Sequence, residues 1–276
     1  MMEITCFGCR GSHVVSGPKF SAFGGHTTSY RILSPECETA FFVDAGTGIC
    51  NAVLPDSIRK AVLFFTHTHL DHIVGFPFLP ALQKKGFELT ICGPVAAYGA
   101  GIKDIMTTLF APAFFPVCWN EFPAHIRFFD FQDETQTIFD GTEIQAFRLP
   151  HSCTTLGCRL KIGNHTAAFC FDAELEALSA DETEKIGRLI EGSDLLIADG
   201  TYTAEEYENG RRGFGHSAAE TAAVFAERFF IKQLGISHHS PTADDNTLTT
   251  REQLLKKRFS KLDLSFLREG MTISLS

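Results

Sequence analysis

The stretch Phe64-Phe65-Thr66-His67-Thr68-His69-Leu70-Asp71-His72 decides the fold. It continues an apolar run that begins at Ala61, and such a run predicts a buried strand ending at the first histidine. Side chains alternate along a strand, so His67 and His69 point the same way, and the turn that follows lets Asp71 and His72 reach the same point. Imidazoles and carboxylates bind zinc and related divalent ions. Buried groups of this kind are costly without a partner, so the stretch predicts a metal site.

The His-x-His-x-Asp-His spacing of this stretch resembles the metal motif of the metallo-β-lactamase-fold hydrolases. Further pieces follow in that family's order over nearly the whole chain: the glycine-containing stretches 7–12 and 22–29, and Asp-Ala-Gly-Thr-Gly at 44–48. The first two resemble the opening of the phosphodiesterase branch, so the chain is similar to phosphoribosyl cyclic phosphate phosphodiesterases and tRNA 3′-processing endonucleases. The resemblance implies a four-layer αββα sandwich, whereas periodicity alone predicts only an α/β or α+β fold.

Length and composition predict a globular protein. The chain has 276 residues, of which 44% are hydrophobic and 21% charged, and no linker interrupts it, so we expect a single domain over 1–276. The net charge of −9 argues against a large nucleic-acid surface, and we therefore do not expect nucleic acid as a partner. Scattered cysteines, a first segment typical of a strand, and no apolar run near the ~20 residues of a membrane span predict a cytoplasmic protein without a membrane partner. A homodimer is left open.

Three later positions complete the metal ligands that the resemblance implies. His151 comes just after an apolar strand, and Asp172 ends another strand, where a carboxylate needs a compensating charge. The pair His238-His239 follows a third strand end, and one of the two should be the last ligand. His238 fits the family's position better, but the register of the loop decides between them.

The resemblance implies two divalent ions. We expect His67, His69 and His151 on the first ion and Asp71, His72 and His238 on the second, with Asp172 reaching both. Zinc is the first choice, with manganese or iron as alternatives. Three nitrogens on one ion leave a position for water, which is typical of a catalytic site. A hydroxide shared by the two ions would then attack the substrate, with Asp71 as a catalytic residue that orients it.

His216 is the second catalytic candidate. It lies in Gly-Phe-Gly-His-Ser-Ala-Ala-Glu at 213–220, which resembles a helix start of the tRNA-processing and phosphodiesterase branches. There the histidine contacts the phosphate or protonates the leaving group. A purely structural alternative is a residue at the helix start, with Ser217 as the cap. A helix N-terminus also suits a phosphate, which favours the functional interpretation.

Other positions receive weaker predictions. Asp199, Thr201 and Tyr202 follow a strand end and should orient a ligand histidine. His26 replaces the usual Asn of the resembling motif, which leaves its contact open. The segment 110–123, rich in Pro and Phe, should form either an apolar wall of the pocket or an ordered loop on the core. A helix is expected over 95–109, and Gly163-Asn164 should form a hairpin turn.

We therefore expect a dinuclear metal-dependent hydrolase, a phosphodiesterase acting on a small phosphodiester or cyclic phosphate. One alternative keeps the ions but hydrolyses an ester, thioester or lactam. Another is a non-hydrolytic diiron binding or sensing protein, which the presence of both His69 and His72 disfavours. A tRNA-processing role would call for a basic Gly/Pro-rich arm, and the sequence shows none.

Overall fold

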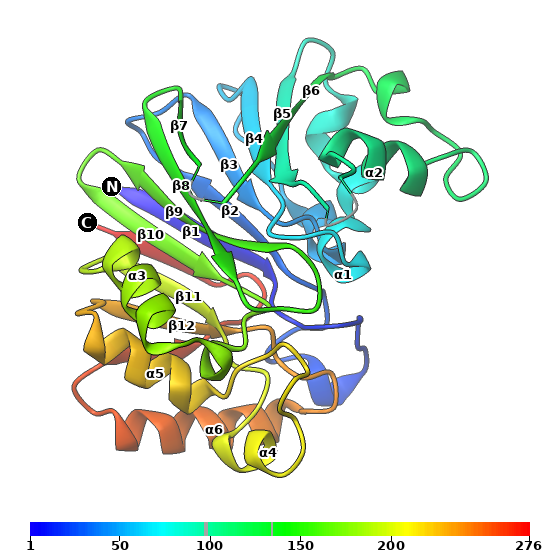
Figure 1. The fold of residues 1–276 in the computed structure, drawn as a ribbon. Coiled ribbons are helices and arrows are strands. Elements are labelled where there is room, and N and C mark those ends of the chain that lie inside the picture. The colour runs from blue at the N-terminus through cyan, green and yellow to red at the C-terminus, as the bar shows by residue number, and fades with distance from the viewer. Residues whose placement is uncertain (97–98, 134) are drawn as a thin grey trace.

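Two seven-stranded sheets pack face to face in the computed structural model, which describes residues 1–96, 99–133 and 135–276. The first sheet has the order β14 (Thr272–Leu275), β1 (Met2–Gly8), β2 (Ser29–Leu33), β3 (Thr39–Val43), β4 (Lys60–Phe64), β5 (Glu88–Pro94) and β6 (His125–Phe131). The second has the order β13 (Asp263–Phe266), β12 (Gln233–Ser237), β11 (Leu195–Asp199), β10 (His165–Cys170), β9 (Thr155–Ile162), β8 (Thr142–Leu149) and β7 (Gln136–Phe139). Figure 1 shows the two sheets and their outer helices.

Helices cover the outer faces of both sheets. On the second sheet lie α3 (Ala180–Ile190), α5 (Ala219–Arg228) and α6 (Asp245–Arg258), with the short α4 (Ala204–Glu208) beside them; α1 (Leu70–Ile73) and α2 (Ile102–Leu109) lie on the side of the first sheet (Figure 1). Three apolar clusters match this layering, one between the sheets and one under each outer layer. The αββα sandwich expected from the resemblance is therefore confirmed. In the described part of the chain, no helix combines the length and apolar character that crossing a bilayer requires.

Local chemistry explains most element boundaries. The apolar strand β4 carries the chain into the histidine motif, and Gly163-Asn164 joins β9 to β10 in an antiparallel hairpin, as predicted. The helix expected over 95–109 begins only at Ile102, and residues 97–98 of that range lie outside the described residues. The strands β7 and β13 were not predicted. The sequence did contain a signal for β7, because Asp140-Gly141 is a dipeptide typical of a tight hairpin turn. In the structure both residues adopt the positive φ angles of such a turn, 48° and 79°.

Strand direction places the functional residues along one edge of the sandwich. Strands β3 and β4 run parallel in the first sheet, and β10, β11 and β12 run parallel in the second. The carboxyl ends of parallel strands meet at one edge of a sheet, so the segments that follow these strands lie near one another. Strand β8 pairs antiparallel with β9, which pairs antiparallel with β10, so β8 ends at that edge as well.

Candidate metal centre

Left-handed backbone turns aim several side chains into the centre. Asp44 follows β3, Asp172 follows β10 by two residues, and His238 follows β12, with φ angles of 60°, 47° and 56°. Residues other than glycine rarely adopt this conformation, and where they do the surrounding structure must hold them there. Three strand ends therefore carry local strain at the positions where polar side chains turn inward.

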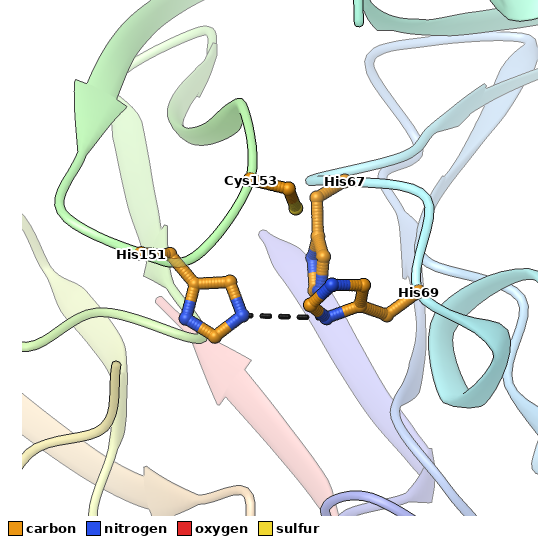
Figure 2. Close-up of side chains that lie close together, drawn as sticks. All are labelled: His67, His69, His151 and Cys153. Carbon is orange, nitrogen blue, oxygen red and sulfur yellow. Dashed lines mark hydrogen bonds between the residues drawn. The ribbon is translucent and has the colours of Figure 1, made fainter. Parts of the chain in front are cut away.

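Three histidines from two loops form the first group. His67 and His69 come from the loop between β4 and α1, and His151 lies between β8 and β9 (Figure 2). Nε2 of His151 lies 3.3 Å from Nδ1 of His69, and Nε2 of His67 lies 3.9 Å from Oδ1 of Asp172. Tetrahedral zinc with bonds of ~2.0 Å to nitrogen needs ligand atoms about 3.3 Å apart, so this spacing suits a single ion.

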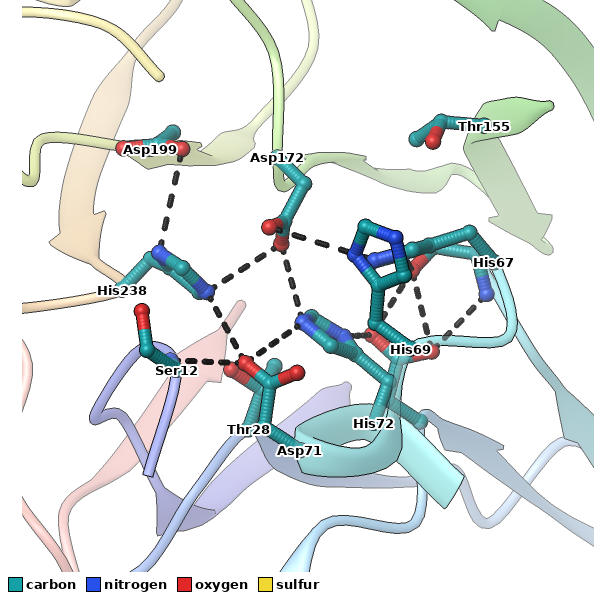
Figure 3. A network of polar contacts seen from close by, with 12 residues as sticks. Ser12, Thr28, His67, His69, Asp71, His72, Thr155, Asp172, Asp199 and His238 are labelled. Carbon is teal, nitrogen blue, oxygen red and sulfur yellow. Dashed lines mark hydrogen bonds and ion pairs between the residues drawn. The ribbon is translucent and has the colours of Figure 1, made fainter. Parts of the chain in front are cut away.

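The second group meets the first at Asp172. Oδ2 of Asp172 lies 2.9 Å from Nε2 of His72 and 3.2 Å from Nε2 of His238. Oδ2 of Asp71 lies 3.4 Å and 3.5 Å from the same two nitrogens (Figure 3). The two oxygens of Asp172 thus face different groups, since Oδ1 is 3.7 Å from Nε2 of His151. A carboxylate placed in this way can contact two ions.

Unpartnered buried atoms test whether ions fit here. Nε2 of His67, His72 and His238 and Oδ2 of Asp172 are buried and lack a partner with hydrogen-bond geometry, although Oδ2 of Asp172 lies 2.9 and 3.2 Å from two of these nitrogens. Buried polar atoms without partners are rare and costly, and four of them converge on one small volume. Imidazole nitrogens and carboxylate oxygens are suitable ligands for zinc and similar divalent ions. The residues present therefore fit a centre that binds divalent metal ions.

Outward hydrogen bonds fix the orientation of each ring. His72 donates from Nδ1 to Asp44 at 2.7 Å, and His151 donates from Nδ1 to the carbonyl of Gly215 at 2.9 Å. Nδ1 of His67 lies 3.1 Å from Oγ1 of Thr66. Similarly, Nδ1 of His238 lies 3.1 Å from Oγ1 of Thr201. These partners hold Nδ1 outward, and Nε2 of all four rings is left for the centre, an arrangement typical of metal-binding histidines.

Two Thr-Asp pairs hold the Nδ1 atoms of His67 and His238 from outside the centre. Oγ1 of Thr66 lies 2.9 Å from Oδ2 of Asp44, and Oγ1 of Thr201 lies 2.8 Å from Oδ1 of Asp199. The expectation that Asp199 and Thr201 orient a ligand histidine agrees with this geometry. The corresponding role of Asp44 was missed, although its position after β3 inside a glycine-rich turn was a usable signal.

Electrostatics keeps the first group neutral. Burial lowers the pKa of His67 well below its usual range, and His72 adds to the effect. Burial also lowers the pKa of His69 and of His151. Metal ligation requires the neutral imidazole, so these shifts favour binding. For His72, burial alone would lower the pKa, but surrounding carboxylates, Asp172 first among them, raise it well above the usual range.

His216 lies at the rim of the centre. Its ring stacks on that of His238 with centroids 4.8 Å apart, and its Nδ1 lies 2.8 Å from Oδ2 of Asp199 and 3.6 Å from Oδ1 of Asp172. Burial alone would lower the pKa of His216, but Asp199 outweighs this effect and the pKa rises to about 9. Asp199 occupies Nδ1 and the side chain is 13% exposed, so Nε2 is the nitrogen left for a molecule in the centre.

His238 and His239 point in different directions. His239 is fully buried, and its Nε2 lies 2.9 Å from the carbonyl oxygen of Leu267. Its ring stacks on Phe266 with centroids 5.5 Å apart, away from the other histidines. The structure therefore places His238 in the cluster and His239 in the core, a choice that the sequence had left open.

The remaining candidates have mixed positions. Nδ1 of His26 lies 3.1 Å from Oγ1 of Thr47, so His26 ties two loops together outside the cluster. In the segment 110–123, Phe110 packs on Phe76 with ring centroids 5.6 Å apart, whereas Phe114 is 76% exposed. Phe114 also lines a groove of about 380 Å³ together with Thr68 and Leu70 of the histidine motif. The segment thus serves both the core and the surface near the centre.

Glu174 is a further residue that sequence reasoning missed. This buried carboxylate accepts hydrogen bonds from the backbone N–H groups of Gly213 and Gly215 at 2.7 and 2.9 Å, and from the Tyr207 hydroxyl at 2.7 Å. Gly215 has a φ of 81°, and a Cβ there would come within 2.3 Å of Nδ1 of His151. Glu174 therefore anchors the loop that carries His216. No pattern in the sequence pointed to this contact across 39 residues.

Comparison with known proteins identifies the family. A family model described as "Beta-lactamase superfamily domain" matches residues 39–239, and the chain belongs to that superfamily. The chain is a metal-dependent hydrolase of the metallo-β-lactamase fold, as the histidine motif predicted.

Individual relatives show which members of the superfamily this chain is similar to. Ribonuclease Z of Ignicoccus hospitalis is 25% identical over 229 residues, which cover 68% of this chain and 73% of that protein. Among solved structures, the metallo-β-lactamase fold protein YhfI from Bacillus subtilis has a TM-score of 0.72 at 19% identity, covering 99% of this chain and 100% of that one. The short form of human tRNase Z has a TM-score of 0.68 at 19% identity and covers 99% of both chains.

These relatives correct one prediction. The acidic net charge led us to exclude nucleic acid as a partner, and that exclusion is wrong, because the Ignicoccus relative is a ribonuclease and the human structure is a tRNase. Net charge averages over the whole surface, whereas a phosphate responds to the local field, which bound cations and nearby arginines can reverse. The value of −9 therefore does not decide the substrate.

Proposed function

We propose that this protein is a dinuclear phosphodiesterase. The observation that carries the proposal is the shared carboxylate of Asp172, whose two oxygens face two separate groups of imidazoles. His67, His69 and His151 would hold one ion, and Asp71, His72 and His238 the other. Zinc is our first choice for both, since imidazole and carboxylate are its usual ligands. Two bound ions would lower the pKa of a water and polarise the oxygens of a phosphoryl group.

The residues of the chain then perform three tasks. Asp71 is held by the backbone N–H of Ser12, 2.7 Å from its Oδ2, so its carboxylate keeps one orientation toward the attacking water. His216 points Nε2 toward the leaving oxygen, and Asp199 keeps the ring protonated. The raised pKa of about 9 supplies the acid form at neutral pH. A phosphodiester with an alkoxide leaving group requires such an acid, whereas a thioester, whose thiolate leaves readily, does not.

An arginine and two aromatic side chains lie beside His216 and indicate which substrates should be tested. The guanidinium of Arg211 lies over the rings of Tyr202 and Phe214, 5.7 Å and 5.5 Å from their centroids, and the Tyr202 ring lies 6.1 Å from that of His216. An arginine between a half-buried and an exposed aromatic ring suits a phosphate or a stacked base. We therefore include both small phosphodiesters, cyclic phosphates among them, and RNA among the substrates to be tested.

A substrate panel tests the proposal. Zinc-loaded protein should hydrolyse bis-p-nitrophenyl phosphate, and the same preparation is tested on cyclic nucleotides, RNA with a 3′ extension, a carboxylic ester, a thioester and a lactam. The variant His67→Ala should lose activity and one equivalent of zinc, whereas His239→Gln, which alters a histidine outside the cluster, should keep both. Turnover confined to esters, thioesters or lactams would overturn the proposal, as would full activity in His67→Ala.

A further inference from the structure

Cys153 lies beside the first group of histidines. It follows His151 by two residues in the connection between β8 and β9. Its Sγ and one ring nitrogen each of His67, His69 and His151 all lie within 4.8 Å of one another (Figure 2). Among the residues that the structure describes, this is the one cysteine that belongs to such a group.

Two observations indicate that this sulfur faces a ligand. Nε2 of His67 is fully buried and has no hydrogen-bond partner in the protein, so it is available to a ligand that the neighbouring sulfur could share. Within the protein, Sγ lies 3.7 Å from Oγ1 of Thr155 and also contacts the backbone of Thr68. A thiol is a poor hydrogen-bond donor and acceptor, so little is lost when it changes partner.

We propose that Cys153 supplies a thiolate ligand to the ion held by His67, His69 and His151. The sulfur–metal bond forms as the S–H bond breaks, the proton passes to solvent, and no electron is transferred. Zinc accepts sulfur together with nitrogen and oxygen ligands and expands to five-coordination. Oδ1 of Asp172 would be the fifth protein ligand of this ion, so a water would bind at the second ion. The inference rests on the metal centre of the proposed function and is independent of the substrate.

A sulfur ligand makes the two halves of the centre chemically different. The first half then offers three nitrogens, a sulfur and one oxygen of Asp172, whereas the second offers two nitrogens, the carboxylate of Asp71 and the other oxygen of Asp172. Soft thiolate ligands select zinc and similar ions over manganese and magnesium. We therefore expect the first half to prefer thiophilic ions and the second to tolerate harder ones.

Cadmium titration tests the inference with a readout other than activity. Protein freed of metal by a chelator receives Cd²⁺ alone, and the thiolate-to-cadmium charge-transfer band is followed in the ultraviolet. Wild type should develop the band over one equivalent. Cys153→Ser should lack it while still binding cadmium by mass spectrometry, and Cys50→Ser, which alters an exposed cysteine, should retain it. A band that persists in Cys153→Ser, or its absence from cadmium-bound wild type, would overturn the inference.

Alkylation of the wild-type chain gives a second measurement that needs no variant. Iodoacetamide labelling with and without zinc, read by peptide mass spectrometry, should show protection of Cys153 by zinc and none of Cys50. Equal labelling of Cys153 in both states contradicts the inference. Phosphodiesterase activity in zinc-loaded protein that lacks this protection refutes the thiolate ligand alone, whereas failure to bind any metal refutes the centre itself.

Discussion

Asp44 accepts a hydrogen bond of 2.7 Å from Nδ1 of His72, and both side chains are fully buried. The same carboxylate contacts Thr66, whose hydroxyl lies 3.1 Å from Nδ1 of His67. A single residue behind the centre therefore orients one histidine of each group. The positive φ of Asp44 shows that the backbone is held in an unusual conformation to make these contacts.

Loss of this carboxylate should weaken metal binding. Replacing a residue that orients a ligand commonly costs ~10–100-fold in metal affinity or activity, and Asp44→Asn should fall in that range because it frees the rings of both His67 and His72. Zinc affinity is measured by competition with a chromophoric chelator. The matched control is Asp194→Asn, which alters a carboxylate that pairs with Lys232 at the surface. Equal zinc affinity in Asp44→Asn and wild type would contradict the role assigned to Asp44.

The effect of replacing His216, the acid at the rim of the centre, should depend on the leaving group of the substrate. A general acid contributes ~10²–10⁴-fold, so His216→Asn should lower kcat by that order for substrates with an alkoxide leaving group. The loss should be far smaller for bis-p-nitrophenyl phosphate, whose leaving group needs no proton. Comparing kcat for the two substrates measures the effect, with zinc content as the control. A uniform loss on both would instead indicate that His216 acts through the metal centre.

The pH profile should report the same group. The pKa of His216 is raised to about 9 by Asp199, so the acid form is present below that value and disappears as the pH rises through it. Bound cations oppose this protonation, so the alkaline limb of kcat should lie at or below about pH 9. Asp199→Asn removes the carboxylate and should move the limb to lower pH. An unchanged limb in that variant would exclude His216 as its source.

The sequence predicted the metal-binding residues of the centre better than the residues that hold them in position. The histidine motif is local, so His67, His69 and His72 were expected together without knowledge of the fold. The strand argument for them was wrong, because β4 ends at Phe64 and the first two histidines lie in the loop after it. His151, Asp172 and His238 follow apolar strands and required the family resemblance to be joined to them. The choice between His238 and His239 depends on a backbone φ of 56° at His238, which no sequence pattern shows.

Long-range contacts explain the other omissions. Asp44 reaches His72 across 28 residues and Glu174 reaches Gly213 across 39, and neither segment alone shows which residue its carboxylate contacts. Their roles arise only when β3 is paired with β4 and when the loop after β10 meets the loop before α5. The wrong exclusion of nucleic acid has a similar cause, because net charge carries no information about where the charges lie.

Glu174 should couple loop stability to activity. Its pKa lies below the usual range, because hydrogen bonds, with that of the Gly213 N–H foremost, outweigh the effect of burial. A group with a depressed pKa stabilises the fold above its unfolded-state pKa and loses that contribution as the pH falls. Glu174→Gln replaces one carboxylate oxygen by an amide donor, which then faces the N–H of either Gly213 or Gly215, and should cost about 1–3 kcal/mol in unfolding free energy.

The same variant should also affect catalysis, because the Gly215 carbonyl orients His151 and the next residue is His216. We expect a lower kcat on substrates with an alkoxide leaving group and an acid-induced loss of stability that is smaller than in wild type. Urea denaturation at pH 7 and pH 4 measures the stability difference, and Glu227→Gln, which alters an exposed carboxylate on α5, serves as the control. If Glu174→Gln and wild type lost the same stability between the two pH values, the carboxylate of Glu174 would not be the group that holds this loop.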